Sequence, residues 1–187
     1  VLDVIHGLRK NAPKSYRASP ETSAQVTFGA SWHEQDSGRL IMLDRYLGCL
    51  AGLAAGDALG TTLEFKLPGS FSPIEDMIGG GPFRLTPGQW TDDTSMALCL
   101  ADSLIECNRF DAADQMKRYC RWREEGYLSS TGACFDIGGT VSSALSRFQE
   151  TGDPFAGSTH ERSAGHGCIM RLAPAPLFSA GHPETAL

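Results

Sequence analysis

The 187-residue sequence lacks the features that mark several broad classes of protein. No stretch near its start combines basic residues with an apolar segment, and no apolar run approaches the length of a membrane span. Its six cysteines include no C-x-x-C pair and no cluster with histidine at zinc spacing. We therefore expect a protein without a signal peptide or membrane span, with reduced thiols and a cytoplasmic location.

The chain also lacks an excess of positive charge. Its 16 Lys and Arg against 22 Asp and Glu give a net charge of -6, which disfavours nucleic-acid binding. The one dense basic run holds Lys117, Arg118, Arg121 and Arg123, with aromatic residues between them at helical spacing and Glu124 directly after. We interpret this run as a solvated helix face rather than a binding patch.

What the chain does contain predicts one globular, all-α domain. Hydrophobic residues make up 41% and charged residues 20%, which is ordinary for a folded protein of this size. Residues 1–42 have no sustained hydrophobic period, so we expect a flexible arm there and the domain at 43–187. Apolar residues at helical spacing predict helices near 44–60, 92–108, 111–125 and 141–151, and no alternating strand pattern is found.

Two further segments are rich in residues that interrupt helices. Residues 67–89 hold four prolines and five glycines, which predicts a long loop with a functional role. A helix is expected to begin at Met170 and to be interrupted by Pro174 and Pro176.

The segment Trp90-Thr91-Asp92-Asp93-Thr94 is the first candidate for chemistry. Its carboxylates and hydroxyls are the hard oxygen ligands that magnesium, calcium or manganese prefers. The same residues also suit an N-cap, because Thr91 can cap a helix and the two acids complement its dipole. Taken alone, this segment favours the interpretation as an N-cap over that as a metal site.

Two acids precede that segment. Asp57 follows a glycine at a helix end, where a turn-forming role is the simpler interpretation. Glu64 lies between Leu63 and Phe65, so burying it would require a partner such as a cation, and solvent exposure is an equal alternative.

A third candidate is the glycine-rich stretch from Ser163 to Arg171. Small residues there leave backbone N–H groups free to converge on an anion such as a diphosphate, and a following helix would add its positive end. A short glycine pair also occurs by chance in many loops, so this stretch has little weight alone.

Four ordered segments together give the chain a more specific resemblance. GDALGTTLEF at 56–65, QWTDDTSMAL at 89–98, FDIGGTVSSAL at 135–145 and SAGHGCIMRLAPAPL at 163–177 resemble the ADP-ribosylglycohydrolase family. The resemblance implies an orthogonal helical bundle, here without the family's C-terminal helices, around a cleft for ADP-ribose and two Mg²⁺ or Mn²⁺ ions. It implies a hydrolase that removes ADP-ribose from a modified protein or an ADP-ribose-containing small molecule.

The resemblance also assigns roles to the candidate residues. Glu64, Thr91, Asp92 and Asp93 match metal ligands, with Glu64 or Asp92 as the catalytic base, and Asp57 matches a carboxylate that supports the site. The residues that match the substrate-binding loops are Gly138, Gly139, Thr140, Ser163, Gly165, His166 and Gly167.

The sequence departs from the family at three places. His166 and Cys168 stand where members have Asn and a small residue, and an imidazole would alter the ribose contacts. No Asp follows Asp153, so the second Gly-Asp-x-Asp-Thr metal motif is missing from these residues. The alternatives to an active hydrolase are a truncated homologue or gene fragment that binds ADP-ribose weakly, and a helical module without a ligand.

Overall fold

The computed structural model describes residues 31–181 and shows a helical protein. Apart from one isolated bridge between Gly80 and Leu85, this part of the chain has no strand, which confirms the all-α prediction. None of its helices is both long and apolar enough to cross a bilayer. The elements are α2 Ser31–Gly60, the 3-10 helix η2 Thr61–Leu63, α3 Asp92–Cys107, α4 Ala112–Glu125, α5 Gly139–Thr151, α6 Gly167–Met170 and α7 Pro174–Gly181.

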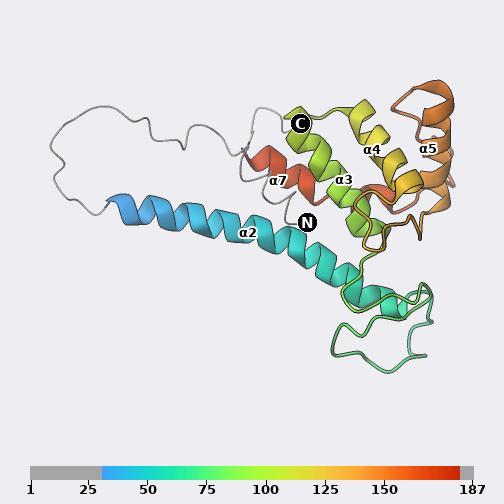
Figure 1. Cartoon of the computed structure of the whole chain (residues 1–187), viewed down its shortest axis with the longest axis horizontal. Coiled ribbons are helices and arrows are strands. Elements are labelled where there is room, and N and C mark those ends of the chain that lie inside the picture. The colour runs from blue at the N-terminus through green and yellow to red at the C-terminus, as the bar shows by residue number, and fades with distance from the viewer. Residues whose placement is uncertain (1–30, 182–187) are drawn as a thin grey trace.

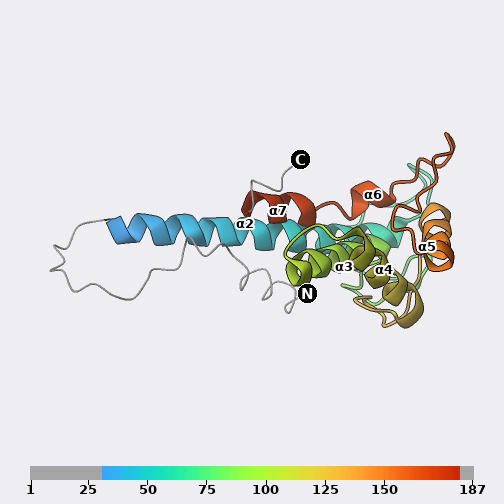
Figure 2. The same ribbon diagram turned by 90° about the horizontal axis from the view of Figure 1, so that it is seen from above.

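Helix α2 is longer than the sequence indicated. It begins at Ser31, so residues 31–42 of the expected arm are helical, while residues 1–30 lie outside the described part of the chain. Its first half extends past the other helices in both views (Figure 1, Figure 2). Its second half ends at Gly60, as the glycines there predicted. Asp57 in this half lies beside the start of α3.

Helix α3 forms the centre of the molecule, where it contacts α2, α4, α6 and α7 (Figure 1). The sequence predicted this because apolar residues occur on most sides of the helix. Met96, Ala97 and Cys99 have no exposed surface, and Ser103 is equally buried. Asn108 in a left-handed conformation ends the helix, a position that Asn tolerates better than most residues.

Helix α4 packs against α3 through its apolar stripe. Tyr119, Cys120 and Trp122 are buried there, and the Asp111 side chain caps the helix by accepting a hydrogen bond from the backbone N–H of Asp114. Gly126 ends the helix at φ 69°, where a Cβ atom would lie 2.1 Å from the carbonyl oxygen of Gly132. Only glycine fits this close approach.

The basic run on α4 has a structural role and is not only a solvated helix face. Arg118 donates to Asp114 at 2.6 Å and forms an ion pair with Asp102 of α3, and its side chain is only 14% exposed. The Tyr127 hydroxyl donates to the same Asp102 carboxylate at 2.5 Å. Arg121 lies 3.8 Å from the centroid of the Tyr127 ring. This network joins α3 and α4, and the prediction of a solvated face is wrong for Arg118.

The C-terminal prolines start a helix instead of interrupting one. Pro174 is the first residue of α7 and Pro176 the third, so both lie in the first turn, where a missing N–H removes no helical bond. The helix expected from Met170 is therefore corrected to two helices, α6 ending at Met170 and α7 beginning at Pro174.

Candidate functional site

Asp57 is the residue that fixes the start of α3. Its carboxylate accepts hydrogen bonds from the backbone N–H groups of Thr91 and Thr94 at 3.0 and 3.1 Å, and from their hydroxyls at 2.8 and 2.7 Å. Thr91 makes no cap through its own side chain, so the expected N-cap is supplied by a residue from another helix. Asp92 and Asp93 therefore stand in the first turn of a helix that Asp57 holds in place.

The segment after α2 positions Glu64. The 3-10 helix η2 carries buried Thr61 and Thr62, and the Thr62 hydroxyl donates to the carbonyl oxygen of Gly79 at 3.0 Å. A Cβ atom on Gly81, at φ 65°, would lie 2.5 Å from the Thr61 carbonyl oxygen. The glycine-rich loop thus packs directly on η2, which gives the long loop a structural role. Thr61 in turn donates a 3.4 Å hydrogen bond to Glu64.

A fifth acid, Asp136, lies beside these acids and belongs to the loop before α5. Its carboxyl group lies close enough to those of Glu64 and Asp92 for its charge to raise the pKa of both. Ser130 ties the same loop to the start of α3 by donating to the Trp90 carbonyl oxygen at 2.6 Å. Sequence reasoning missed Asp136, although it lies in the FDIGG segment that carried the family resemblance, one residue before Ile137 and the predicted glycines.

The acids raise one another's pKa values. Burial is the largest cause at Glu64, followed by the charge of Asp136, and together they raise its pKa to about 7. Burial and then the charges of Asp136 and Asp93 raise the pKa of Asp92 to about 7. The pKa values of Asp93 and Asp136 are raised too, mainly by burial. The charged neighbours that contribute most to these four shifts in pKa are themselves acids, Asp57 included.

The structure therefore brings together all the acids predicted for the metal site, which the sequence places in two separate segments. Their charges affect one another, so Glu64 and the Asp92-Asp93 pair share one face of the molecule. Within residues 31–181, no group of three or more His, Cys, Asp or Glu side chains is placed to hold a metal ion as it stands. Binding a cation would require these side chains to turn toward a common point.

The predicted substrate loops lie together at the start of α5. Gly138 caps this helix without any side-chain hydrogen bond, which leaves its first N–H groups available to an anion. A Cβ atom on Gly165 would lie 3.2 Å from the Thr140 hydroxyl, and one on Gly167 would lie 2.8 Å from the Val141 side chain. The loop at 163–167, which includes Ser163 and the exposed His166, therefore packs on the first turn of α5, which begins three residues after Asp136.

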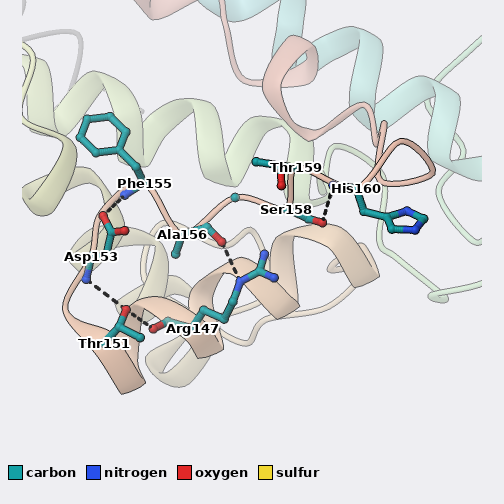
Figure 3. A pocket seen from close by; sticks show the side chains of 9 residues that line it. Arg147, Thr151, Asp153, Phe155, Ala156, Ser158, Thr159 and His160 are labelled. Carbon is teal, nitrogen blue, oxygen red and sulfur yellow. Dashed lines mark hydrogen bonds between the residues drawn. The ribbon is translucent and has the colours of Figure 1, made fainter.

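A separate hollow of about 460 Å³ lies at the other end of α5 (Figure 3). It is lined by Arg147, Thr151 and the turn-rich loop that follows, and Arg147 donates to the carbonyl oxygen of Ala156 at 2.8 Å. None of the predicted site residues lines it. The carboxylates and the glycine-rich loops, not this hollow, form the candidate site.

Comparisons with known proteins point to one family. The family model for ADP-ribosylglycohydrolase matches residues 39–187. The chain is similar to the ADP-ribosylarginine hydrolase Tri1 of Serratia proteamaculans (strain 568), with 51% identity over 136 residues that cover 73% of this chain and 37% of the relative. It is also similar to the ADP-ribosyl-[dinitrogen reductase] glycohydrolase of Rhodospirillum rubrum, with 39% identity over 75% of this chain and 46% of that protein.

A solved structure shows the same fold. The ADP-ribosylglycohydrolase-related protein complex matches with a TM-score of 0.60 and 44% identity, over 77% of this chain and 50% of the matched one. The chain therefore spans between about a third and a half of the length of the relatives described here.

Proposed function

Because this chain belongs to the ADP-ribosylglycohydrolase family, we propose that it provides the first metal-binding and ADP-ribose-binding elements of a hydrolase that cleaves ADP-ribose from modified proteins. The observation that carries the proposal is the meeting of four acids with raised pKa values, from three separate segments, beside the start of α5, which has no side-chain cap. Groups with perturbed pKa values and no structural cation are typical of functional sites.

Divalent cation binding is the first part of the proposal. Glu64, Asp92, Asp93 and the Thr91 hydroxyl offer hard oxygen ligands, which fit Mg²⁺ or Mn²⁺, and Asp136 adds a further carboxylate. Without a counter-charge these acids repel one another, so a cation would lower all four pKa values at once. A bound ion would supply charge neutralisation and a more acidic water molecule.

Proton transfer is the second part. Glu64 and Asp92 have pKa values of about 7, and a bound cation would lower both, so that near neutral pH each is ionised and able to accept a proton. We expect one of the two to take a proton from the attacking water, whose oxygen bonds to ribose C1 while the bond from C1 to the acceptor side chain breaks and that side chain takes up the proton as it leaves. Asp57 does not touch this reaction, because its oxygen atoms are held by Thr91 and Thr94.

Diphosphate binding is the third part. The N–H groups at Gly139 and Thr140 and the adjoining loop at 163–167 suit an anion, since a helix start carries partial positive charge. Gly167 has no room for a side chain against Val141, so the loop can approach α5 closely. His166 is exposed on this loop and would face the ribose or phosphate groups.

The test is release of ADP-ribose from an ADP-ribosylarginine peptide, measured by chromatography with and without Mg²⁺. We expect Mg²⁺-dependent release by the purified chain, and a loss of at least about 100-fold in Asp92→Asn, the size typical of a removed general base. Asp44→Asn, an exposed acid on α2, is the matched control and should keep full activity.

Two results would contradict the proposal. Release of ADP-ribose that does not depend on a divalent cation would show that the metal-binding part of the proposal is wrong. Binding of ADP-ribose without any release would favour the alternative, a homologue that binds ADP-ribose but does not hydrolyse its conjugates.

A further inference from the structure

Arg171 connects the glycine-rich loop at 163–167 and the short helix α6 to the centre of the molecule. It directly follows α6, and its guanidinium carbon Cζ lies 4.8 Å from the centroid of the Tyr119 ring on α4. Its Nη1 atom donates to the sulfur atom of Met96 on α3 at 3.7 Å. Tyr119 and Met96 are 2% and 0% exposed, so one side chain contacts core residues of two helices.

The other hydrogen bonds of this stretch are local. In the described part of the chain, the hydrogen bonds of residues 158–170 all stay within residues 158–172. Arg171 forms no ion pair with an acid among residues 31–181, so the ring and the sulfur are its partners there. The loop and α6 are therefore held on α3 and α4 by the Arg171 side chain and by apolar packing such as that of Met170.

This connection lies between two parts of the candidate site. Met96 is three residues after Asp93 on α3, in the turn that follows the acids. A Cβ atom on Gly167 would lie 3.9 Å from Nη1 of Arg171 and 2.8 Å from the Val141 side chain on α5. The guanidinium therefore borders both the helix that carries the acids and the loop that packs on α5. A misplacement of about 1 Å in a binding element can be costly, so the spacing of loop and helices matters for a ligand between them.

We propose that Arg171 is a positioning residue, which holds the loop at 163–167 at the distance from α3 and α5 that ADP-ribose binding requires. It acts through the loop, because its guanidinium is engaged by the Tyr119 ring and the Met96 sulfur. The proposal rests on the proposed function, which assigns this loop to the diphosphate. A guanidinium suits the role better than an ammonium, because its flat face stacks on a ring while an N–H at its edge reaches a second partner.

Hydrogen exchange of the free protein, followed residue by residue by NMR, tests the connection without any ligand. Arg171→Met keeps the apolar stem and removes the guanidinium. We expect the N–H groups of Ile169 and Met170, which donate to the carbonyl of His166 in α6, to exchange about 3- to 10-fold faster, the size of a cation–π contact. The N–H of Gly152, at the far end of α5, should keep its rate.

Three further variants separate the guanidinium from its surroundings. Arg171→Lys should give exchange rates between those of the wild-type chain and Arg171→Met. Tyr119→Phe should keep the wild-type rates, because it retains the ring and removes only a buried hydroxyl that has no hydrogen-bond partner. Arg45→Met, at an exposed arginine on α2, is the matched control and should change nothing.

Calorimetry then measures whether the position of the loop sets the affinity for ADP-ribose. In Arg171→Met the dissociation constant of ADP-ribose should rise about 3- to 10-fold. That of Mn²⁺ should stay within about twofold, because Asp57, not Arg171, holds the acids at the start of α3. A purely structural loss would weaken the binding of both.

Unchanged exchange in Arg171→Met, or an equal rise that includes Gly152, would overturn the proposal. An Arg171→Met chain that binds ADP-ribose as tightly as the wild-type chain would overturn it as well. If the wild-type chain binds no ADP-ribose, the proposed function fails at the diphosphate, and the exchange rates alone decide whether Arg171 holds the loop.

Discussion

Replacing Asp57 by alanine tests how α3 and the acids at its start are held in place. The Asp57 carboxylate accepts hydrogen bonds from four donors, which are the backbone N–H and hydroxyl groups of Thr91 and Thr94. Both threonines are buried, at 3% and 1% exposure. In Asp57→Ala the hydroxyls can turn to other acceptors, but the two backbone N–H groups lose their partner.

The expected loss follows from these contacts. A buried N–H group without a partner costs about 1–3 kcal/mol, and a lost acid at a helix start costs about 0.3–1 kcal/mol more. We therefore expect Asp57→Ala to lower the free energy of unfolding by about 3–5 kcal/mol, a large part of an ordinary domain's stability. Asp57→Asn keeps one oxygen acceptor and should lose about 2 kcal/mol.

Urea unfolding followed by tryptophan fluorescence measures this loss, since Trp90 adjoins Thr91 and Trp122 lies in the core. Asp44→Ala, at an exposed acid on the same helix, should change the stability by less than about 0.5 kcal/mol. A loss below about 1 kcal/mol in Asp57→Ala would show that these hydrogen bonds do not hold the start of α3.

Three other predictions test the acids, the α3–α4 network and the turn after α4. Raised carboxyl pKa values mean that the folded state binds protons more tightly, so stability should fall as pH rises from about 4.5 to about 7. Glu64→Gln or Asp92→Asn should flatten this fall in urea titrations, and saturating Mg²⁺ should reverse it. Arg118→Met should lower the free energy of unfolding by about 2 kcal/mol, because Asp102 and Asp114 lose their partner. Gly126→Ala should prevent folding as judged by circular dichroism, whereas Gly132→Ala, also at positive φ but in open space, should cost only about 1 kcal/mol.

The helices were predictable because their signals are local. Apolar spacing predicted where α2 to α5 end to within a residue, and the structure ends them at Gly60, Cys107, Glu125 and Thr151. The prolines of α7 were misjudged, because the same residue that interrupts a helix interior also suits its first turn.

The site was predictable only in part, because its decisive contacts join distant segments. The acids at 64 and 92–93 were identified from their type and from the family resemblance. The cap from Asp57 to the start of α3 spans 34 residues, and no local pattern predicts it. Asp136 was missed because an acid before a glycine pair looks like a turn residue, and only the fold brings it to Glu64 and Asp92.

Calorimetric titration of the purified chain with Mn²⁺ tests most directly whether the acids at the start of α3 hold a divalent cation. We predict saturable binding that ADP-ribose strengthens and that both Glu64→Gln and Asp92→Asn weaken by about tenfold or more. Binding that is absent, or that is equal in the wild-type chain and both variants, would contradict it.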